Sequence, residues 1–152
     1  MNISDNFSLE ELTKSQTALR MGLENRPDGE QLVCLQTLCE EVLEPLRHHF
    51  AKPVIVNSAF RAKAVNRAIG SKGTSQHTLG RAADVEVLGV GNDVAAQWIF
   101  QNLSFDQLIL EYFVAGEPHS GWVHVSYVNP SENRHQVLTI NKSGVYGGLI
   151  TT

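Results

Sequence analysis

Cysteine is scarce in this chain, which has two in 152 residues, Cys34 and Cys39. They lie five positions apart in a segment predicted to be helical, where five residues turn by about 500°. Their thiols therefore point in different directions and cannot form a local disulfide. We expect two small hydrophobic residues of a core in a reducing compartment, rather than a bridge or a metal-binding pair.

Long apolar runs and clusters of positive charge are also missing. No stretch approaches the roughly 18 apolar residues of a membrane span, and the first residues lack the basic and apolar regions of a signal peptide. The 12 Lys and Arg residues are outnumbered by 16 Asp and Glu residues, giving a formal net charge of −4. No basic cluster is available to displace counterions from phosphates. We therefore expect synthesis in the cytoplasm, no nucleic-acid partner and no stable membrane association.

The chain does have enough apolar sequence for a folded core. Hydrophobic residues make up 42% of it and charged residues only 18%, which argues against disorder. A chain of this length buries roughly 68–70% of its unfolded surface. No repeat, low-complexity tract or linker divides it. We predict a single domain over residues 1–152, and a monomer.

Helical patterns dominate the first half of the chain. Helices are expected over Ser8 to about Leu19, Glu30 to near Phe50, Ala62 to Ile69, and Asn92 to about Leu103. Ser8 and Glu11 have the spacing of a capping box, in which each side chain bonds to the other residue's backbone N–H. Pro45 falls inside the second segment and should kink or break that helix.

Strand-like runs cluster in the second half of the chain. They cover residues 54–56, 82–87, 107–112, 122–128 and 137–141. Helices come first and the strands follow without regular alternation of strand and helix. This order favours an α+β domain, built on a small antiparallel sheet flanked by helices.

The segment from Ser75 to Asp84 is the most informative for chemistry. His77 and Asp84 lie seven positions apart across a glycine-containing turn into a strand, so their side chains can converge. His124 lies in an alternating run, on the face opposite Val123 and Val125. Two His and one Asp form the kind of ligand set that catalytic Zn²⁺ uses. The alternative is a His–Asp pair on neighbouring strands that only forms a hydrogen bond.

The same segment resembles the hedgehog/DD-peptidase fold family. That family contains zinc D-alanyl-D-alanine carboxypeptidases and phage L-alanyl-D-glutamate endolysins. Five positions match its S-x-H-x-x-G-x-A-x-D signature: Ser75, His77, Gly80, Ala82 and Asp84. Two further elements follow in the family's order, because residues 58–61 (SAFR) look like its S-G-Y-R element and residues 122–125 (WVHV) resemble its second-histidine strand. The resemblance extends from about Phe7 to Tyr127.

The resemblance implies roles for particular residues. His77, Asp84 and His124 would bind Zn²⁺. Arg61 would face the metal, where its guanidinium could hold a substrate carboxylate or stabilise the oxyanion formed as the carbonyl is attacked. Three further residues are implied near the substrate or the ligands: Ser75, Gln76 and Trp122.

The general base is where the sequence departs from the family. Many members carry an acidic residue three positions before the final His, and that position is Gly121 here. Glu111 is one candidate, since an acidic group that ends an apolar strand requires a partner. His119 is another, because some carboxypeptidase-type members place a His near the metal at this spacing. Glu117 is a third, in a loop, and the sequence leaves the choice open.

Together with the resemblance, these residues predict a zinc-dependent peptidase. It would hydrolyse peptidoglycan stem peptides at a bond involving a D-amino acid, as a carboxypeptidase or as an endopeptidase. Without a visible signal peptide or wall-binding module, it resembles a phage or prophage endolysin that acts on the wall after release. The alternatives are a catalytically inactive, zinc-containing binding module and a phage structural subunit of the same fold.

Overall fold

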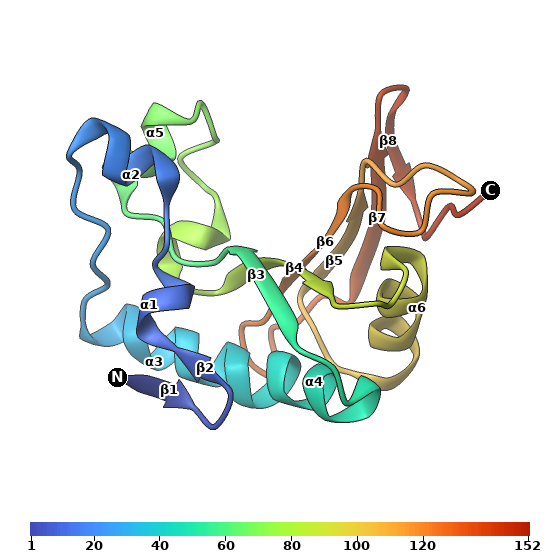
Figure 1. The fold of residues 1–152 in the computed structure, drawn as a ribbon, viewed down its shortest axis with the longest axis horizontal. Coiled ribbons are helices and arrows are strands. Elements are labelled where there is room, and N and C mark those ends of the chain that lie inside the picture. Colours follow the sequence, from blue (N-terminus) through green and yellow to red (C-terminus); the bar gives the residue numbers. More distant parts are fainter.

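A mixed six-stranded sheet lies at the centre of the computed structural model, which describes residues 1–152 (Figure 1). In spatial order the strands are β3 (Val54–Ser58), β4 (Ala82–Val87), β6 (Trp122–Ser126), β5 (Gln107–Glu111), β7 (Gln136–Asn141) and β8 (Gly144–Gly147). Two short strands, β1 (Asn2–Ser4) and β2 (Phe7–Ser8), form a separate antiparallel pair. The predicted α+β class is confirmed.

One pair in the sheet is parallel, so the sheet is mixed and not wholly antiparallel as the sequence predicts. β5 and β7 run in the same direction, and every other neighbouring pair is antiparallel. β6 ends beside the start of β5, and β7 begins on the other side of the same point. The connection over residues 127–135 therefore crosses only the start of β5. Backbone bonds from Asp106 to Ser126 and from His135 to Phe105 hold this crossing in place.

The helices are short and lie mostly in the first two thirds of the chain. They are α1 (Leu9–Leu12), α2 (Gln16–Met21), α3 (Gly29–Leu38), α4 (Glu44–Phe50), α5 (Lys63–Ala68) and α6 (Asn92–Asn102), with a π-helical segment η1 (Cys39–Leu43) and a 3₁₀ turn η2 (Gln76–Leu79). None of them is long and apolar enough to cross a membrane.

Two of the expected helices differ in detail. The capping box at Ser8 and Glu11 is present, but the single helix expected to reach Leu19 is split into α1 and α2. The side chain of Ser15 accepts a bond from the Ala18 N–H at 3.1 Å and starts a new helix there. The disruption expected at Pro45 is not a break: α3, η1 and α4 follow one another directly, and the π-helical turn accommodates the missing N–H of this proline.

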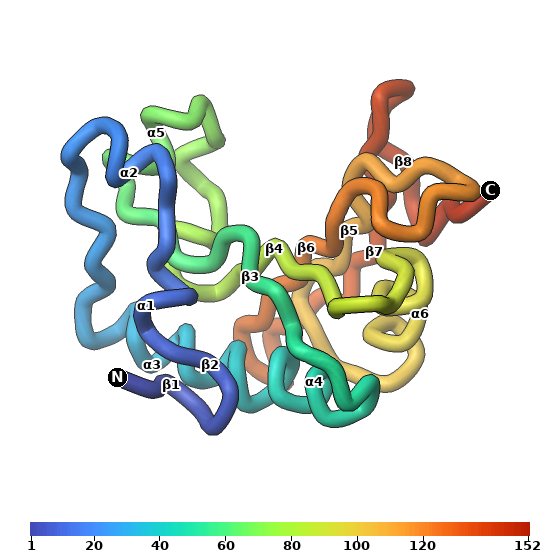
Figure 2. Tube along the Cα trace, in the orientation of Figure 1, coloured from blue at the N-terminus to red at the C-terminus, as the bar shows by residue number.

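The strands alternate between a core face and an open face. Val85, Val123 and Val125 join the apolar core, together with side chains of α3, η1, α4 and α6. Cys39 belongs to this core, and both cysteines are free thiols. The residues between the core valines face the other side of the sheet. There, Figures 1 and 2 show α2 and α5 at one side and the β7–β8 hairpin at the other.

Candidate active site

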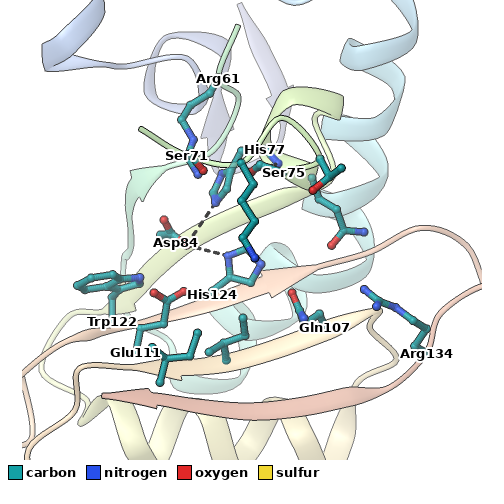
Figure 3. Close-up of a pocket in the computed structure, with 15 residues that line it drawn as sticks. Arg61, Ser71, Ser75, His77, Asp84, Gln107, Glu111, Trp122, His124 and Arg134 are labelled. Atoms are coloured by element: carbon teal, nitrogen blue, oxygen red, sulfur yellow. Dashed lines mark hydrogen bonds and ion pairs between the residues drawn. The ribbon is translucent and has the colours of Figure 1, made fainter. Parts of the chain in front are cut away.

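A pocket of about 720 Å³ lies on the open face of the sheet (Figure 3). It gathers eight of the ten side chains singled out from the sequence: Arg61, Ser75, Gln76, His77, Asp84, Glu111, Trp122 and His124. These residues come from the segment after β3, from η2, and from β4, β5 and β6. Residues from distant parts of the chain therefore line one cavity.

His77, Asp84 and His124 meet because of strand register and one tight turn. Asp84 and His124 are direct partners in the antiparallel pair β4–β6, so their side chains leave the same face of the sheet. His77 lies in η2, where the Ser75 hydroxyl accepts a bond from the His77 N–H at 3.3 Å. Gly80, at φ +74°, ends η2 and returns the chain into β4.

The distances within this trio are short. His124 Nδ1 lies 3.0 Å from Asp84 Oδ1, and His77 Nε2 lies 3.5 Å from the same oxygen. His77 Nδ1 is 2.7 Å from the carbonyl oxygen of Ala59, to which it donates its hydrogen. This bond fixes the ring so that the lone pair of Nε2 points into the pocket, the arrangement found behind metal-bound histidines.

The surroundings set the charges of these ligand atoms. Burial lowers the pKa of His77, which favours the neutral ring that a metal requires. Burial acts to raise the pKa of Asp84, but the hydrogen bond from His124 and the proximity of His77 outweigh it and hold that pKa well below its usual range. The site therefore presents a carboxylate beside a neutral imidazole.

This donor set fits a zinc ion. One ligand atom from each of the three residues lies within 4.8 Å of the others. Two imidazole nitrogens and one carboxylate oxygen are ligands that zinc accepts, and three protein ligands leave a fourth position open to water or substrate. The bond from His77 to Ala59 supplies the outer support that such ligands normally have.

Arg61 enters the pocket from the segment after β3, above the ligand trio in Figure 3. Its backbone N–H donates to the carbonyl of His77 at 3.1 Å, so the two residues are held together. The guanidinium Nε is fully buried and has no hydrogen-bond partner in the protein. Burial lowers the pKa of Arg61, but a guanidinium stays protonated. A half-buried cation with a buried, unused Nε donor is suited to an anionic ligand.

Glu111 and Trp122 form the wall at the end of β5. They are direct partners across β5 and β6, and both side chains line the pocket. Burial and the neighbouring Asp84 raise the pKa of Glu111, against the opposing effects of His124 and Arg61. The buried indole Nε1 has no hydrogen-bond partner in the protein. A carboxyl group with a raised pKa, beside a metal site, is suited to proton transfer.

Gly121 explains why the family's usual acidic position is empty here. Its φ is +65°, and a Cβ at this position would overlap the carbonyl oxygen of Glu111 and lie 2.6 Å from the carbonyl carbon of Tyr112. No side chain fits between β5 and β6 at this point. The carboxylate beside the ligand trio comes instead from Glu111, on the neighbouring strand.

Like Glu117, His119 is a candidate that the structure does not bring to the pocket. It is exposed on the loop between β5 and β6 and is not part of the pocket wall. Backbone bonds close this loop into a tight turn, from Glu117 to Val114 and from Ser120 to Glu117. The spacing of His119 from His124 suggested proximity, but the turn directs it into solvent. Glu117 is exposed on the same loop.

Asp106 and Arg134 are pocket features that sequence reasoning missed. Arg134 lines the pocket, and Asp106 lies behind it with only 2% of its surface exposed. The two form an ion pair at 2.8 Å. The charged residue next to the apolar run of β5 was a signal for Asp106. Nothing in the sequence around Arg134 indicated its partner, which lies 28 positions away.

Comparison with known proteins agrees with this geometry. Residues 5–126 match the family model of Peptidase M15, whose members are zinc-dependent peptidases. The match includes Arg61, the three candidate ligands and Glu111. A search of curated proteins returned no match. Because the family model covers 122 of the 152 residues, the chain belongs to the peptidase M15 family.

Proposed function

We propose that this protein is a zinc-dependent peptidase that cleaves peptidoglycan stem peptides at a bond involving a D-amino acid. The observation that carries the proposal is the buried His77–Asp84–His124 set, with Glu111 and Arg61 lining the same pocket. The resemblance of residues 58–61, 75–84 and 122–125 to wall-cleaving zinc peptidases supports this choice of substrate.

Zinc held by His77, Asp84 and His124 would supply Lewis-acid polarisation of the scissile carbonyl and would lower the pKa of a water to about 7. Glu111 accepts the proton of the attacking water and returns it to the leaving amine. Arg61 donates to the oxygen on which negative charge develops, or to a terminal carboxylate of the peptide. Ser75 positions His77, through its bond to the His77 N–H.

The resemblance to phage endolysins supports a narrower proposal, that the enzyme lyses cell walls after release from the cell in which it is made. A non-catalytic binding module was the main alternative, and it rested on the missing acid at position 121. The pocket holds a carboxylate in Glu111, so that argument loses its basis.

Digestion of purified peptidoglycan tests the proposal. We expect mass spectrometry to show cleaved stem peptides, with loss of cleavage after treatment with a chelator and recovery on adding Zn²⁺. The sizes of the fragments distinguish removal of a terminal residue from internal cleavage. His77→Ala is the matched control, and metal analysis should show that it no longer retains about one zinc per chain. Cleavage that persists in a metal-free sample would contradict the proposal.

A further inference from the structure

Asp106 anchors Arg134 at the end of the pocket where β5 begins. The Asp106 carboxylate accepts from Arg134 three times, from its backbone N–H at 3.0 Å, from Nε at 3.0 Å and from Nη2 at 2.8 Å. It also accepts from Gln76 Nε2 at 2.9 Å. All hydrogen-bond donors to this carboxylate therefore come from residues of the pocket wall. The two side-chain bonds from Arg134 are bidentate, which fixes the orientation of its guanidinium.

This contact leaves several N–H groups of the Arg134 guanidinium free. A guanidinium carries five N–H groups, and Asp106 accepts two of them, which leaves three without a protein acceptor. The side chain remains 55% exposed, whereas that of Asp106 is 3% exposed. If Arg134 served only to hold residues 127–135 in place, it would need no unpaired N–H groups facing the pocket.

The position of Arg134 separates it from the chemistry. Figure 3 shows it at the opposite end of the pocket from Trp122 and Glu111, with Gln107 between. Strand register agrees, since β5 starts at Gln107 and ends at Glu111. A peptide that lies along β5 with its scissile bond at the ligand trio would reach Arg134 with a group several bonds away.

The charges in the pocket indicate what that group is. Three cations line the pocket, Arg61, Lys72 and Arg134, although the chain as a whole has a net charge of −4. The two lining carboxylates, Asp84 and Glu111, lie at the metal end. Figure 3 shows Gln107 next to Arg134, and Gln76 shares the Asp106 carboxylate with Arg134, so both neighbours are neutral amides. At this end a ligand therefore meets the open N–H donors of Arg134 and two amides, while the Asp106 carboxylate that balances the charge of Arg134 is buried behind it.

We propose that Arg134 binds a carboxylate of the peptide substrate away from the scissile bond, and that Asp106 and Gln76 hold it in position to do so. The inference rests on the proposed function, because it assigns specificity to the same pocket. The planar guanidinium matches a carboxylate with two parallel bonds, which a lysine cannot reproduce. The carboxylate comes either from a side group within the peptide or from its C-terminus.

Three matched stem peptides test the proposal: one with all carboxylates free, one with the internal side carboxylate amidated, and one with the C-terminus amidated. We expect wild-type protein to prefer the free peptide over one of the amides by about tenfold in kcat/KM, as a charge-assisted bond at a half-exposed site would give. Arg134→Gln should bring this ratio close to one by slowing the two peptides that keep the bound carboxylate, but not the amide that lacks it, and that amide identifies the source.

Two variants keep the test specific. Lys52→Gln makes the same change of charge on an exposed turn, outside the pocket lining, and should leave the ratio unchanged. Asp106→Asn leaves Arg134 in place without its ionic anchor and should lose part of the preference. Arg134→Lys keeps the charge and should also retain only part of it, which decides the case even if Arg134→Gln is poorly folded.

The outcomes separate this inference from the proposed function. If wild-type protein cleaves none of the three peptides, the proposed function fails. If it cleaves them but Arg134→Gln and Arg134→Lys slow all three peptides equally, Arg134 has only a structural role and the inference is overturned. A wild-type ratio of one for both amides would overturn it as well.

Discussion

Glu111 and His119 are both possible proton acceptors by sequence, but the fold gives them opposite surroundings. Glu111 ends β5 with its carboxylate in the pocket, where burial raises its pKa above the ordinary value. His119 is exposed on the following loop. Position relative to the ligand trio therefore distinguishes two residues that spacing alone could not.

Replacing Glu111 by Gln should lower kcat by about 10²–10⁴, the usual contribution of a positioned acid–base group. The amide keeps the size of the side chain but cannot accept the proton. Zinc content should stay at the wild-type level, because Glu111 is not among the candidate ligands. Steady-state kinetics and metal analysis measure both quantities.

His119→Ala is the matched control and should retain nearly full turnover, since its side chain is outside the pocket. Equal losses in the two variants, or a near-normal kcat in Glu111→Gln, would show that the proton acceptor lies elsewhere.

The connection between β5 and β6 is the element that shapes the metal end of the pocket. Tyr112 follows Glu111 at φ +55°, and Gly121 precedes Trp122 at φ +65°. The two strands approach so closely there that the α-carbon of Gly121 faces the backbone of residues 111–113. The backbone of this connection thus fixes where the side chains of Glu111 and Trp122 begin.

Gly121→Ala should destabilise the protein by about 2–4 kcal/mol. The left-handed conformation costs a residue with a Cβ about 1–2 kcal/mol, and the overlap with the Glu111 carbonyl forces a further backbone shift. Activity should fall as well, because the shift moves Glu111. Urea denaturation monitored by circular dichroism gives the change in free energy of unfolding.

Gly116→Ala separates strain from overlap. Gly116 lies in the same loop at φ +85°, but a Cβ there would have no atom within 4 Å. Gly116→Ala should therefore lower the free energy of unfolding only by the cost of the left-handed conformation, and it should leave kcat unchanged. Equal destabilisation in the two variants would mean that the overlap of a Cβ at position 121 with the backbone of β5 adds nothing to the loss of stability.

At the scale of the whole molecule, local patterns predicted the elements better than they predicted how the elements pair. The bounds of β4 were predictable from the local sequence pattern. The convergence of His77, Asp84 and His124 was predictable from the short signature over residues 75–84 and the alternating run around His124. The parallel pairing of β5 with β7 was not predictable, because it depends on where residues 127–135 cross the sheet. The short strand β8 was missed, since its glycine-rich sequence has little strand character.

The Asp106–Arg134 pair shows the same limit for the site. The two residues come together only because the crossing segment passes the start of β5, where Asp106 also holds Gln76 of η2. Three segments far apart in the sequence therefore share one buried carboxylate. No short motif contains that information, so this end of the pocket could be found only in the fold.

Stability at acidic pH should report this junction. Hydrogen bonds from Arg134, which outweigh burial, lower the pKa of Asp106 to about 2, from about 3.9 for an unperturbed Asp. The unfolded chain binds the proton first as pH falls, so the stabilisation is complete above about pH 4 and is lost on acidification toward pH 2. The carboxylate should contribute about 2 kcal/mol near pH 6 and about half of that at pH 3.

Urea denaturation of wild type and Asp106→Asn measures this contribution. The difference in unfolding free energy between the two proteins should be smaller at pH 3 than at pH 6, and the difference between wild type and Arg134→Gln should change in the same way. A difference that does not change with pH would mean that the ion pair does not link Asp106 ionisation to folding.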